Sequence, residues 1–284
     1  MIPDWQTNCV FLTSLLQARH PSVFTALQET LRSHGVEVRL LHEARDIWAS
    51  DYCPVQVGSN RIVQFLYEPD YLENSPELRT GRSVADQFRD FGEIEHSEIN
   101  IDGGNVVASE QTAILTDKIY RENPTWERAR LRAELRRLLQ VNQLIVIPKE
   151  PYDPIGHVDA MVRFIDEQSV LVNDYSQIDA AFGERLKAVL QRHGLAIEPM
   201  PYFHEKVSKD GIPSAVGGFT NFLRTEKVLV APVYESNEDH VALKKLESAF
   251  PGLPIVPLNC TNLAREGGVL NCVSVSFRIS TDQF

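Results

Sequence analysis

The sequence predicts an α/β fold in which five units, each a helix with several strands, are arranged around a centre. Five amphipathic segments with helix-start signals are spread along the 284 residues, beginning at positions 22, 83, 123, 176 and 236. Their average separation is roughly 54 residues, and a repeat of this size favours a radial or solenoid array. Short apolar, β-branched runs fill the intervals, as strands would. An ordinary α/β sheet is the alternative that the periodicity leaves open.

Each predicted helix begins at a residue whose side chain can accept a hydrogen bond from free backbone amides. Asn123 precedes Pro124, a residue suited to the first helical position. Ser176 and Ser236 are each followed by aspartate three residues later, which resembles a capping box. The predicted helices are residues 22–34, 83–91, 123–140, 176–193 and 236–250.

The predicted strands are runs of three to six apolar residues between these helices. They are residues 36–41, 62–67, 113–116, 144–148, 161–165, 170–172, 219–223, 228–231, 255–258 and 273–277.

Composition restricts the classes of partner. The chain is 43% hydrophobic and 24% charged, with a net charge of −11. This acidity argues against nucleic acid as a partner and suits a cationic small molecule. No apolar run approaches the roughly 20 residues that span a bilayer, and the first residues do not resemble a signal peptide. We therefore expect a cytoplasmic protein that does not bind membranes, with its four scattered cysteines as free thiols.

Three motifs contain acids that could enter a common site with a histidine. His157 and Asp159 are two residues apart on a predicted strand, so both side chains would point to one face. Such a pair could bind a metal, relay protons or simply form a surface ion pair. Asp51 lies in an apolar, aromatic stretch and could hold a guanidinium bidentately, or serve as a turn or salt-bridge residue. Asp102 precedes paired glycines, which allow a plain turn or close approach to a ligand.

Two cysteines raise separate questions. Cys272 follows the Gly267-Gly268 pair and a short apolar run, and it is either a buried strand residue or a reactive thiol. A reactive thiolate needs a neighbouring cation or base, which His157 could supply. Cys53, two residues after Asp51, is either a packing residue or a redox-sensitive second thiol near Cys272.

Together these motifs resemble the agmatine deiminase and Porphyromonas-type peptidylarginine deiminase family, within the guanidine-group-modifying superfamily. Each motif is weak alone, and their order and spacing are specific. They are Ile47-Trp48 through Gln56, Phe65 to Tyr71, Asp102-Gly103-Gly104-Asn105 to Val107, Glu122-Asn123-Pro124, Gly156-His157-Val158-Asp159 to Phe164, Asn221-Phe222 before Val228, and Gly267-Gly268 to Cys272.

The resemblance implies a pentein fold, a five-bladed α/β propeller of ββαβ repeats around a central active site, formed by residues 1–284 as a single catalytic domain. It implies Cys272 as the nucleophile and His157 as the general acid and base, with Asp102 as a further catalytic acid. It implies substrate binding by Asp51 and Asp159, which hold the guanidinium, and by Trp48, Asn105 and Gly268. No metal and no cofactor are expected.

The activity implied is a cysteine-dependent hydrolase, a deiminase of a small guanidino compound such as agmatine. It would pass through a covalent thiouronium intermediate and give a ureido product and ammonia. Arginine or peptidylarginine deimination, amidine transfer, metal-dependent hydrolysis and non-catalytic guanidino binding are the alternatives. A homodimer is the candidate assembly.

Three positions depart from the family pattern. Ser50 stands where arginine often precedes the first aspartate, Asp102 where many members have glutamate, and Asn271 where histidine commonly precedes the nucleophile. These departures bear on the substrate. Its distal end could meet any of Lys118, Arg121, Arg163, Arg224 and Arg265 if it carries a carboxylate.

Overall fold

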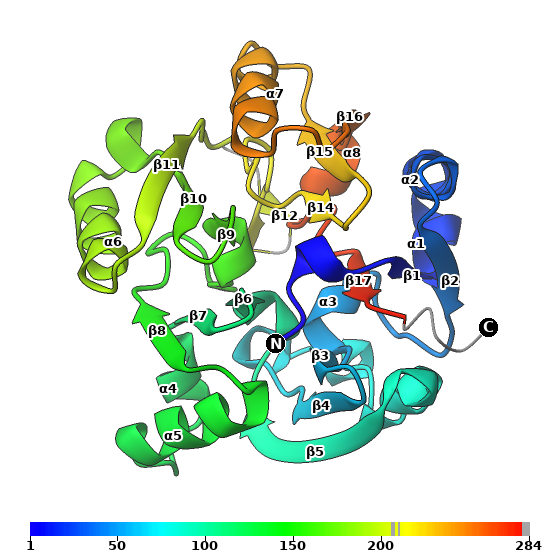
Figure 1. The fold of residues 1–284 in the computed structure, drawn as a ribbon, viewed down its shortest axis with the longest axis vertical. Helices are drawn as coiled ribbons and strands as arrows, with labels where there is room; N and C mark the ends of the chain where they lie inside the picture. The colour runs from blue at the N-terminus through cyan, green and yellow to red at the C-terminus, as the bar shows by residue number, and fades with distance from the viewer. Residues whose placement is uncertain (206–207, 210, 280–284) are drawn as a thin grey trace.

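The computed structural model describes residues 1–205, 208–209 and 211–279 and shows a ring of five α/β units (Figure 1). Each unit contains a three-stranded sheet with the same pairing pattern. The inner strand is antiparallel to the middle strand, and the middle strand is parallel to the outer one. The predicted five-bladed α/β propeller is confirmed.

The blades follow one another along the chain. Their sheets, from inner to outer strand, are β17 (Ser274–Phe277), β1 (Cys9–Thr13) and β2 (Glu37–Leu41); β3 (Val55–Gly58), β4 (Arg61–Leu66) and β5 (Glu93–Asn100); β6 (Val107–Ala108), β7 (Thr112–Thr116) and β8 (Gln143–Ile147); β9 (Val162–Phe164), β10 (Ser169–Asn173) and β11 (Ala196–Met200); and β14 (Leu223–Arg224), β15 (Leu229–Val233) and β16 (Ile255–Asn259). A two-stranded sheet pairs β12 (Ser208–Lys209) with β13 (Ile212–Pro213).

Helices cross between the parallel middle and outer strands, because parallel neighbours need a long connection. The α-helices among them lie on the outside of the ring (Figure 1). In blade order they are α1 (Ser14–Arg19) with α2 (Pro21–Ser33); the 3₁₀ helices η2 (Asp70–Leu72), η3 (Pro76–Leu78) and η4 (Arg82–Phe91); α4 (Lys118–Glu122) with α5 (Arg128–Leu139); η7 (Tyr175–Gln177) with α6 (Ala180–Arg192); and α7 (Glu238–Ala249).

The ring is closed by the end of the described chain. Strand β17 pairs antiparallel with β1, placing Phe277 opposite Cys9 and Ser274 opposite Leu12. The first blade therefore takes its inner strand from the C-terminal part of the sequence. This pairing fixes the turn before β17, which contains Cys272, against the N-terminal blade.

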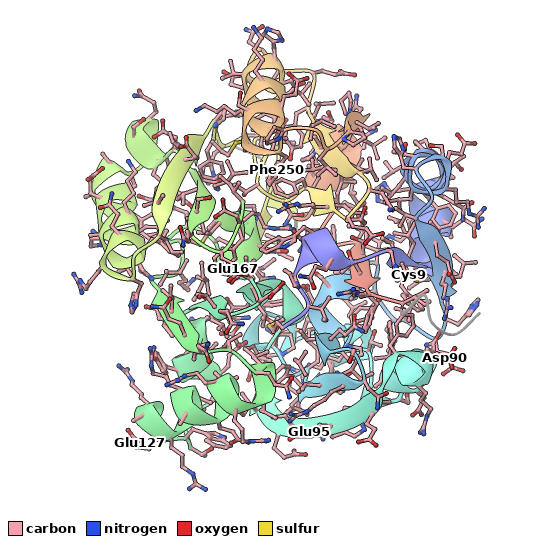
Figure 2. The ribbon with its side chains drawn as sticks, viewed as in Figure 1. Cys9, Asp90, Glu95, Glu127, Glu167 and Phe250 are labelled. Carbon is pink, nitrogen blue, oxygen red and sulfur yellow. The ribbon has the colours of Figure 1, made fainter. Side chains whose placement is uncertain are left out.

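Apolar side chains pack between each helix and its sheet and drive the folding of the blade. In the fourth blade, Phe182, Leu186 and Leu190 of α6 lie in one buried cluster with Val170 and Val172 of β10. Charged side chains such as those of Asp90, Glu95 and Glu127 lie toward the rim of the ring (Figure 2). No helix in the described part of the chain is long and apolar enough to cross a membrane.

Some predicted elements were wrong in detail. The second predicted helix is the 3₁₀ helix η4, and the third begins at Arg128, where the Glu127 side chain caps Ala129 and Arg130. Asn123 instead ends α4. Of the predicted strand 219–223, only Leu223 is in a strand; Phe219 and Phe222 are buried core residues in irregular backbone. The sequence prediction also missed β1, β3, β5, β6, β11, β12 and β13.

Asn123 joins α4 to the end of β5 by a buried carboxamide. Its Oδ1 accepts a hydrogen bond from Asn100 N at 2.9 Å, and its Nδ2 donates to Asn100 O at 2.8 Å and Ile119 O at 2.9 Å. These hydrogen bonds hold α4, which contains Lys118, beside β5, which leads to Asp102.

We predict that Asn123→Ala lowers the free energy of unfolding by about 2–3 kcal/mol, since three backbone groups would lose their buried partner. Chemical denaturation measures this, with the exposed Asn60→Ala as the control, expected to change it by less than about 0.5 kcal/mol. An equally small effect of Asn123→Ala would contradict the assigned role.

Candidate active site

A cavity of about 280 Å³ lies where loops from several blades meet. Six of the eight residues predicted to form the site line it: Trp48, Asp51, His157, Asp159, Gly268 and Cys272. Trp48 and Asp51 belong to the start of α3 (Ala49–Tyr52), and Cys272 lies in the turn before β17. The structure thus brings together motifs separated by more than 200 residues of sequence.

His157 and Asp159 both line the cavity, but the backbone reason predicted for this was wrong. They lie at and within η6 (Val158–Ala160), a 3₁₀ turn that precedes β9. The tight turn starts just after Gly156, the last residue of the preceding loop, which has a positive φ of 71°. Val158, between the two polar residues, is fully buried in the apolar core.

His157 lies between two carboxylates. Its Nε2 is 2.7 Å from Asp102 Oδ2, and its Nδ1 is 3.6 Å from Asp51 Oδ1. Burial opposes the charge of the ring, but the charge of Asp51 and the hydrogen bond to Asp102 raise the pKa of His157 to about 9. The imidazolium is therefore the dominant form at neutral pH, with Nδ1 directed toward Asp51.

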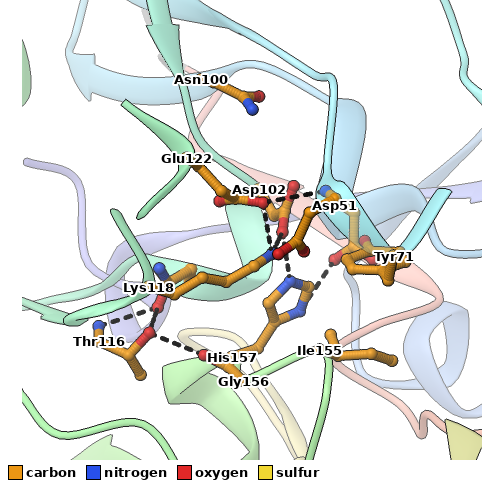
Figure 3. Close-up of polar contacts among 12 residues, drawn as sticks. Asp51, Tyr71, Asn100, Asp102, Thr116, Lys118, Glu122, Ile155, Gly156 and His157 are labelled. Atoms are coloured by element: carbon orange, nitrogen blue, oxygen red, sulfur yellow. Dashed lines mark hydrogen bonds and ion pairs between the residues drawn. The ribbon is translucent and has the colours of Figure 1, made fainter. Parts of the chain in front are cut away.

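Behind His157, Asp102 belongs to a fully buried chain of charges (Figure 3). The Lys118 ammonium contacts Asp102 Oδ2 and is 3.0 Å from Glu122 Oε1. It also lies 4.8 Å from the centre of the Tyr71 ring, which packs edge-on against His157. Burial would raise the pKa of Asp102, but Lys118 and His157 outweigh it and lower that pKa. Asp102 thus stays ionised and orients the imidazole.

Asp51 is short of compensating charge. Burial, followed by the nearby charges of Asp102 and Asp159, raises its pKa to about 7, even though His157 opposes this shift. Asp159 contributes a second buried carboxylate, whose Oδ1 has no hydrogen-bond partner among the described residues. Two partly satisfied carboxylates at one cavity are suited to bind a planar cation with several N–H donors.

Asn221 fixes the position of Cys272. Its Oδ1 accepts from the backbone N of Asn271 at 3.1 Å and of Cys272 at 3.3 Å, and lies 3.4 Å from Cys272 Sγ. The sulfur is also 3.7 Å from Asp159 Oδ2. Asn221 was not among the predicted site residues, although its motif was recognised. Burial and then Asp159 and Asp51 raise the pKa of Cys272 well above its ordinary value.

Two of the departures from the family pattern hold the site together. Ser50 Oγ donates to Asp51 Oδ1 at 2.9 Å, and Ser50 N donates to the carbonyl of Cys272 at 3.1 Å. Asn271 Nδ2 donates to Asp159 Oδ2 at 2.7 Å. Both small polar residues therefore orient the carboxylates around the cavity.

Two glycines allow this close packing. A Cβ atom on Gly104 would lie 2.6 Å from His157 Nδ1 and 2.8 Å from Asp51 Oδ1. A Cβ atom on Gly268 would lie 2.6 Å from the Trp48 ring and 3.0 Å from Cys272 Cβ. Gly268 therefore lets the indole form a wall of the cavity beside the thiol.

Asp102 and Asn105 are not among the residues that line the cavity. Asp102 contacts it only through His157. Asn105 is fully buried and accepts from Thr116 N and Oγ1, both at 2.9 Å, and its contact with the substrate stays a prediction. Cys53 is also buried, and burial raises the pKa of its thiol well above the ordinary value. Its predicted redox link to Cys272 stays a prediction.

Each basic residue considered as a partner for a substrate carboxylate is close to an acid and lies outside the cavity lining. These pairs are Lys118 with Asp102 and Glu122, Arg121 with Asp70, Arg163 and Arg224 with Asp4, and Arg265 with Glu205. The cavity instead contains Arg19, which is 3.6 Å from Asp46 and 2.6 Å from Glu266. Within the described residues, no group of three or more His, Cys, Asp and Glu side chains is arranged to hold a metal ion.

Comparison with known proteins agrees with this arrangement. A protein assigned as an agmatine deiminase from Shewanella sp. strain MR-4 is 26% identical, over 89% of this chain and 79% of its own length. The solved C. jejuni agmatine deiminase with substrate bound superposes with a TM-score of 0.79 at 15% identity, covering 98% of this chain and 96% of the other. Dimethylarginine dimethylaminohydrolase from Pseudomonas aeruginosa, complexed with citrulline, gives a TM-score of 0.61 at 10% identity, over 96% of this chain and all of that one.

The chain therefore has the fold shared by these solved guanidino-modifying enzymes, an agmatine deiminase and a dimethylarginine dimethylaminohydrolase. More specifically, the sequence model of Porphyromonas-type peptidyl-arginine deiminase matches residues 10–277, so the chain belongs to that family. Family membership makes it a hydrolase of carbon–nitrogen bonds in linear amidines.

We predict that Gly104→Ala lowers kcat/KM at least ~100-fold while the protein still folds, because the new methyl group separates His157 from Asp51. The matched control is Gly81→Ala, where the added Cβ would meet only Ser83 Oγ at 3.9 Å. Circular dichroism checks folding and steady-state kinetics check activity. Unchanged kinetics in Gly104→Ala would contradict the proposed contact.

Proposed function

We propose that the protein is a cysteine-dependent deiminase that hydrolyses the guanidinium group of a small cationic compound, with agmatine as the leading substrate. The observation that carries this proposal is the meeting of the Cys272 thiol, the His157 imidazole and two buried carboxylates at one cavity. The relatives assigned as agmatine deiminases support the substrate class.

Binding is the first step of the proposed mechanism. Asp51 and Asp159 accept hydrogen bonds from the guanidinium nitrogens and hold its plane beside Cys272. The bound cation replaces the missing positive charge at these acids. It also lowers the pKa of the Cys272 thiol, because an adjacent positive charge favours the thiolate.

The thiolate then attacks the guanidinium carbon and forms a tetrahedral adduct. The carbon–nitrogen bond to one terminal nitrogen breaks, and His157 donates its Nδ1 proton to that nitrogen, which leaves as ammonia. The product on the enzyme is a thiouronium in which sulfur is bonded to the former guanidinium carbon and the substrate tail is retained.

In the second half, neutral His157 takes a proton from water, whose oxygen attacks the thiouronium carbon. The carbon–sulfur bond breaks, the proton of the adduct hydroxyl passes to the departing sulfur, and the ureido product leaves Cys272 as a thiol. Asp102 holds His157 through Nε2 in both halves and leaves Nδ1 to transfer protons, while Lys118 and Glu122 balance the charge of Asp102.

The tail of the substrate would lie among the other residues that line the cavity. Leu72, Leu78 and Ile155 suit a methylene chain. Asp46 and Arg19 also line the cavity, with Arg19 Nη1 3.6 Å from Asp46 Oδ1. The preference for agmatine over arginine rests on the relatives assigned as agmatine deiminases.

We predict that Cys272→Ala lowers kcat for ammonia release from agmatine at least ~10⁴-fold, and His157→Ala at least ~100-fold. The control is Cys260→Ala, because Cys260 is a buried free thiol in the apolar core and does not line the cavity. It should keep activity within about twofold. Near-normal release of ammonia by either site variant would overturn the mechanism.

A further inference from the structure

A second, smaller chamber of about 70 Å³ adjoins the substrate cavity at the nucleophile. The two spaces share five lining residues: Asp153, Ala160, Gly267, Gly268 and Cys272. The second chamber is otherwise lined by different residues, among them Glu150, Tyr202, His204 and Asn221. Cys272 therefore faces two spaces, of which only the larger contains Asp51, His157 and Asp159.

We propose that this second chamber is a site for small neutral hydrogen-bonding molecules, where water enters and ammonia leaves between the two halves of the reaction. The inference rests on the proposed deiminase function and adds a route for water and ammonia that is separate from the substrate cavity. It assigns a role to residues around Ala215 and Glu150 that do not contact the guanidinium.

The need for such a path follows from the chemistry. A deiminase expels a terminal nitrogen, so the substrate tail stays attached to the thiouronium and still occupies the larger cavity. Ammonia must leave and water must arrive while that route is blocked. A space that also reaches Cys272 but does not hold the tail meets both needs.

The walls of the chamber suit water. The Nδ2 atom of Asn221 is a buried donor without a hydrogen-bond partner among the described residues, and Asn221 is itself 2% exposed. Its Oδ1 atom holds the backbone of Cys272, so this donor lies close to the reacting sulfur. A volume of about 70 Å³ holds a few water molecules at roughly 10–15 Å³ each, but no alkyl guanidine.

A buried polar cluster forms another part of the chamber. Glu150, 3% exposed, accepts from the hydroxyls of Tyr175 and Tyr202, both at 2.9 Å, and lies 3.1 Å from His204 Nε2. These contacts provide hydrogen-bond partners for the buried carboxyl group. Polar walls of this kind stabilise ordered water near the thiouronium.

The test fills the chamber without touching the substrate cavity. Ala215 lines only the smaller space and is half-buried. Ala215→Leu adds three carbon atoms there, and the exposed Ala196→Leu is the matched control. Rapid-quench mass spectrometry with agmatine measures formation and decay of the adduct on Cys272. The adduct increases the mass of the protein by that of the substrate less one ammonia.

We expect Ala215→Leu to form the adduct within about twofold of the wild-type rate and to hydrolyse it at least tenfold more slowly, so that the adduct accumulates. Ala196→Leu should match the wild type. The milder Ala215→Val serves as the test if melting curves show that the leucine variant is unfolded.

Three results would count against these ideas. Equal slowing of adduct formation and decay, or a raised KM, would assign the chamber to the substrate tail and overturn the proposal. Unchanged rates in a folded Ala215→Leu variant would also overturn it. If the wild type turns over agmatine and the Cys272→Ala variant still does so, the deiminase mechanism itself is overturned.

Discussion

The properties of the active site are determined by an excess of buried negative charge around one cavity. Asp51, Asp102, Asp159 and Glu122 are all largely withdrawn from water, and within this cluster only His157 and Lys118 compensate them. Uncompensated buried charge is costly, and it raises the pKa of Asp51 to about 7. The same imbalance raises the pKa of His157 and, together with burial, that of Cys272. In the proposed mechanism a guanidinium supplies the positive charge that these acids lack.

The propeller is what makes this crowding possible. Each blade directs a loop or short helix toward the centre, so acids from different blades meet without a long connection. Ring closure by β17 sets the turn of Cys272 against Ser50, and the missing side chain of Gly104 lets His157 approach Asp51. The buried apolar clusters between helices and sheets offset the cost of the charged centre.

The sequence was sufficient for the number of blades and for most of the residues that meet at the cavity. Helical periodicity suggested five units, and the resemblance of the motifs around Asp51, His157, Asp159 and Cys272 to a known family implied the propeller and the site residues. It failed where tertiary contacts override local signals. Asn123 looks like a helix start, yet it bonds to Asn100 across the blade. The burial of Asn105 follows from tertiary packing, which no local sequence spacing encodes. The same holds for the hydrogen bonds of Ser50 to Asp51 and of Asn271 to Asp159.

The measurement that most directly tests the electrostatic account is calorimetric binding of agmatine to Cys272→Ala between pH 5.5 and 8.5. Because Asp51 is protonated in the empty site below about pH 7, binding must release its proton there. We predict that affinity rises about tenfold per pH unit up to pH 7 and then levels off, with this dependence lost in Asp51→Asn. Affinity that is independent of pH, or a dependence that survives in Asp51→Asn, would contradict the claim that this buried carboxylate awaits a cation.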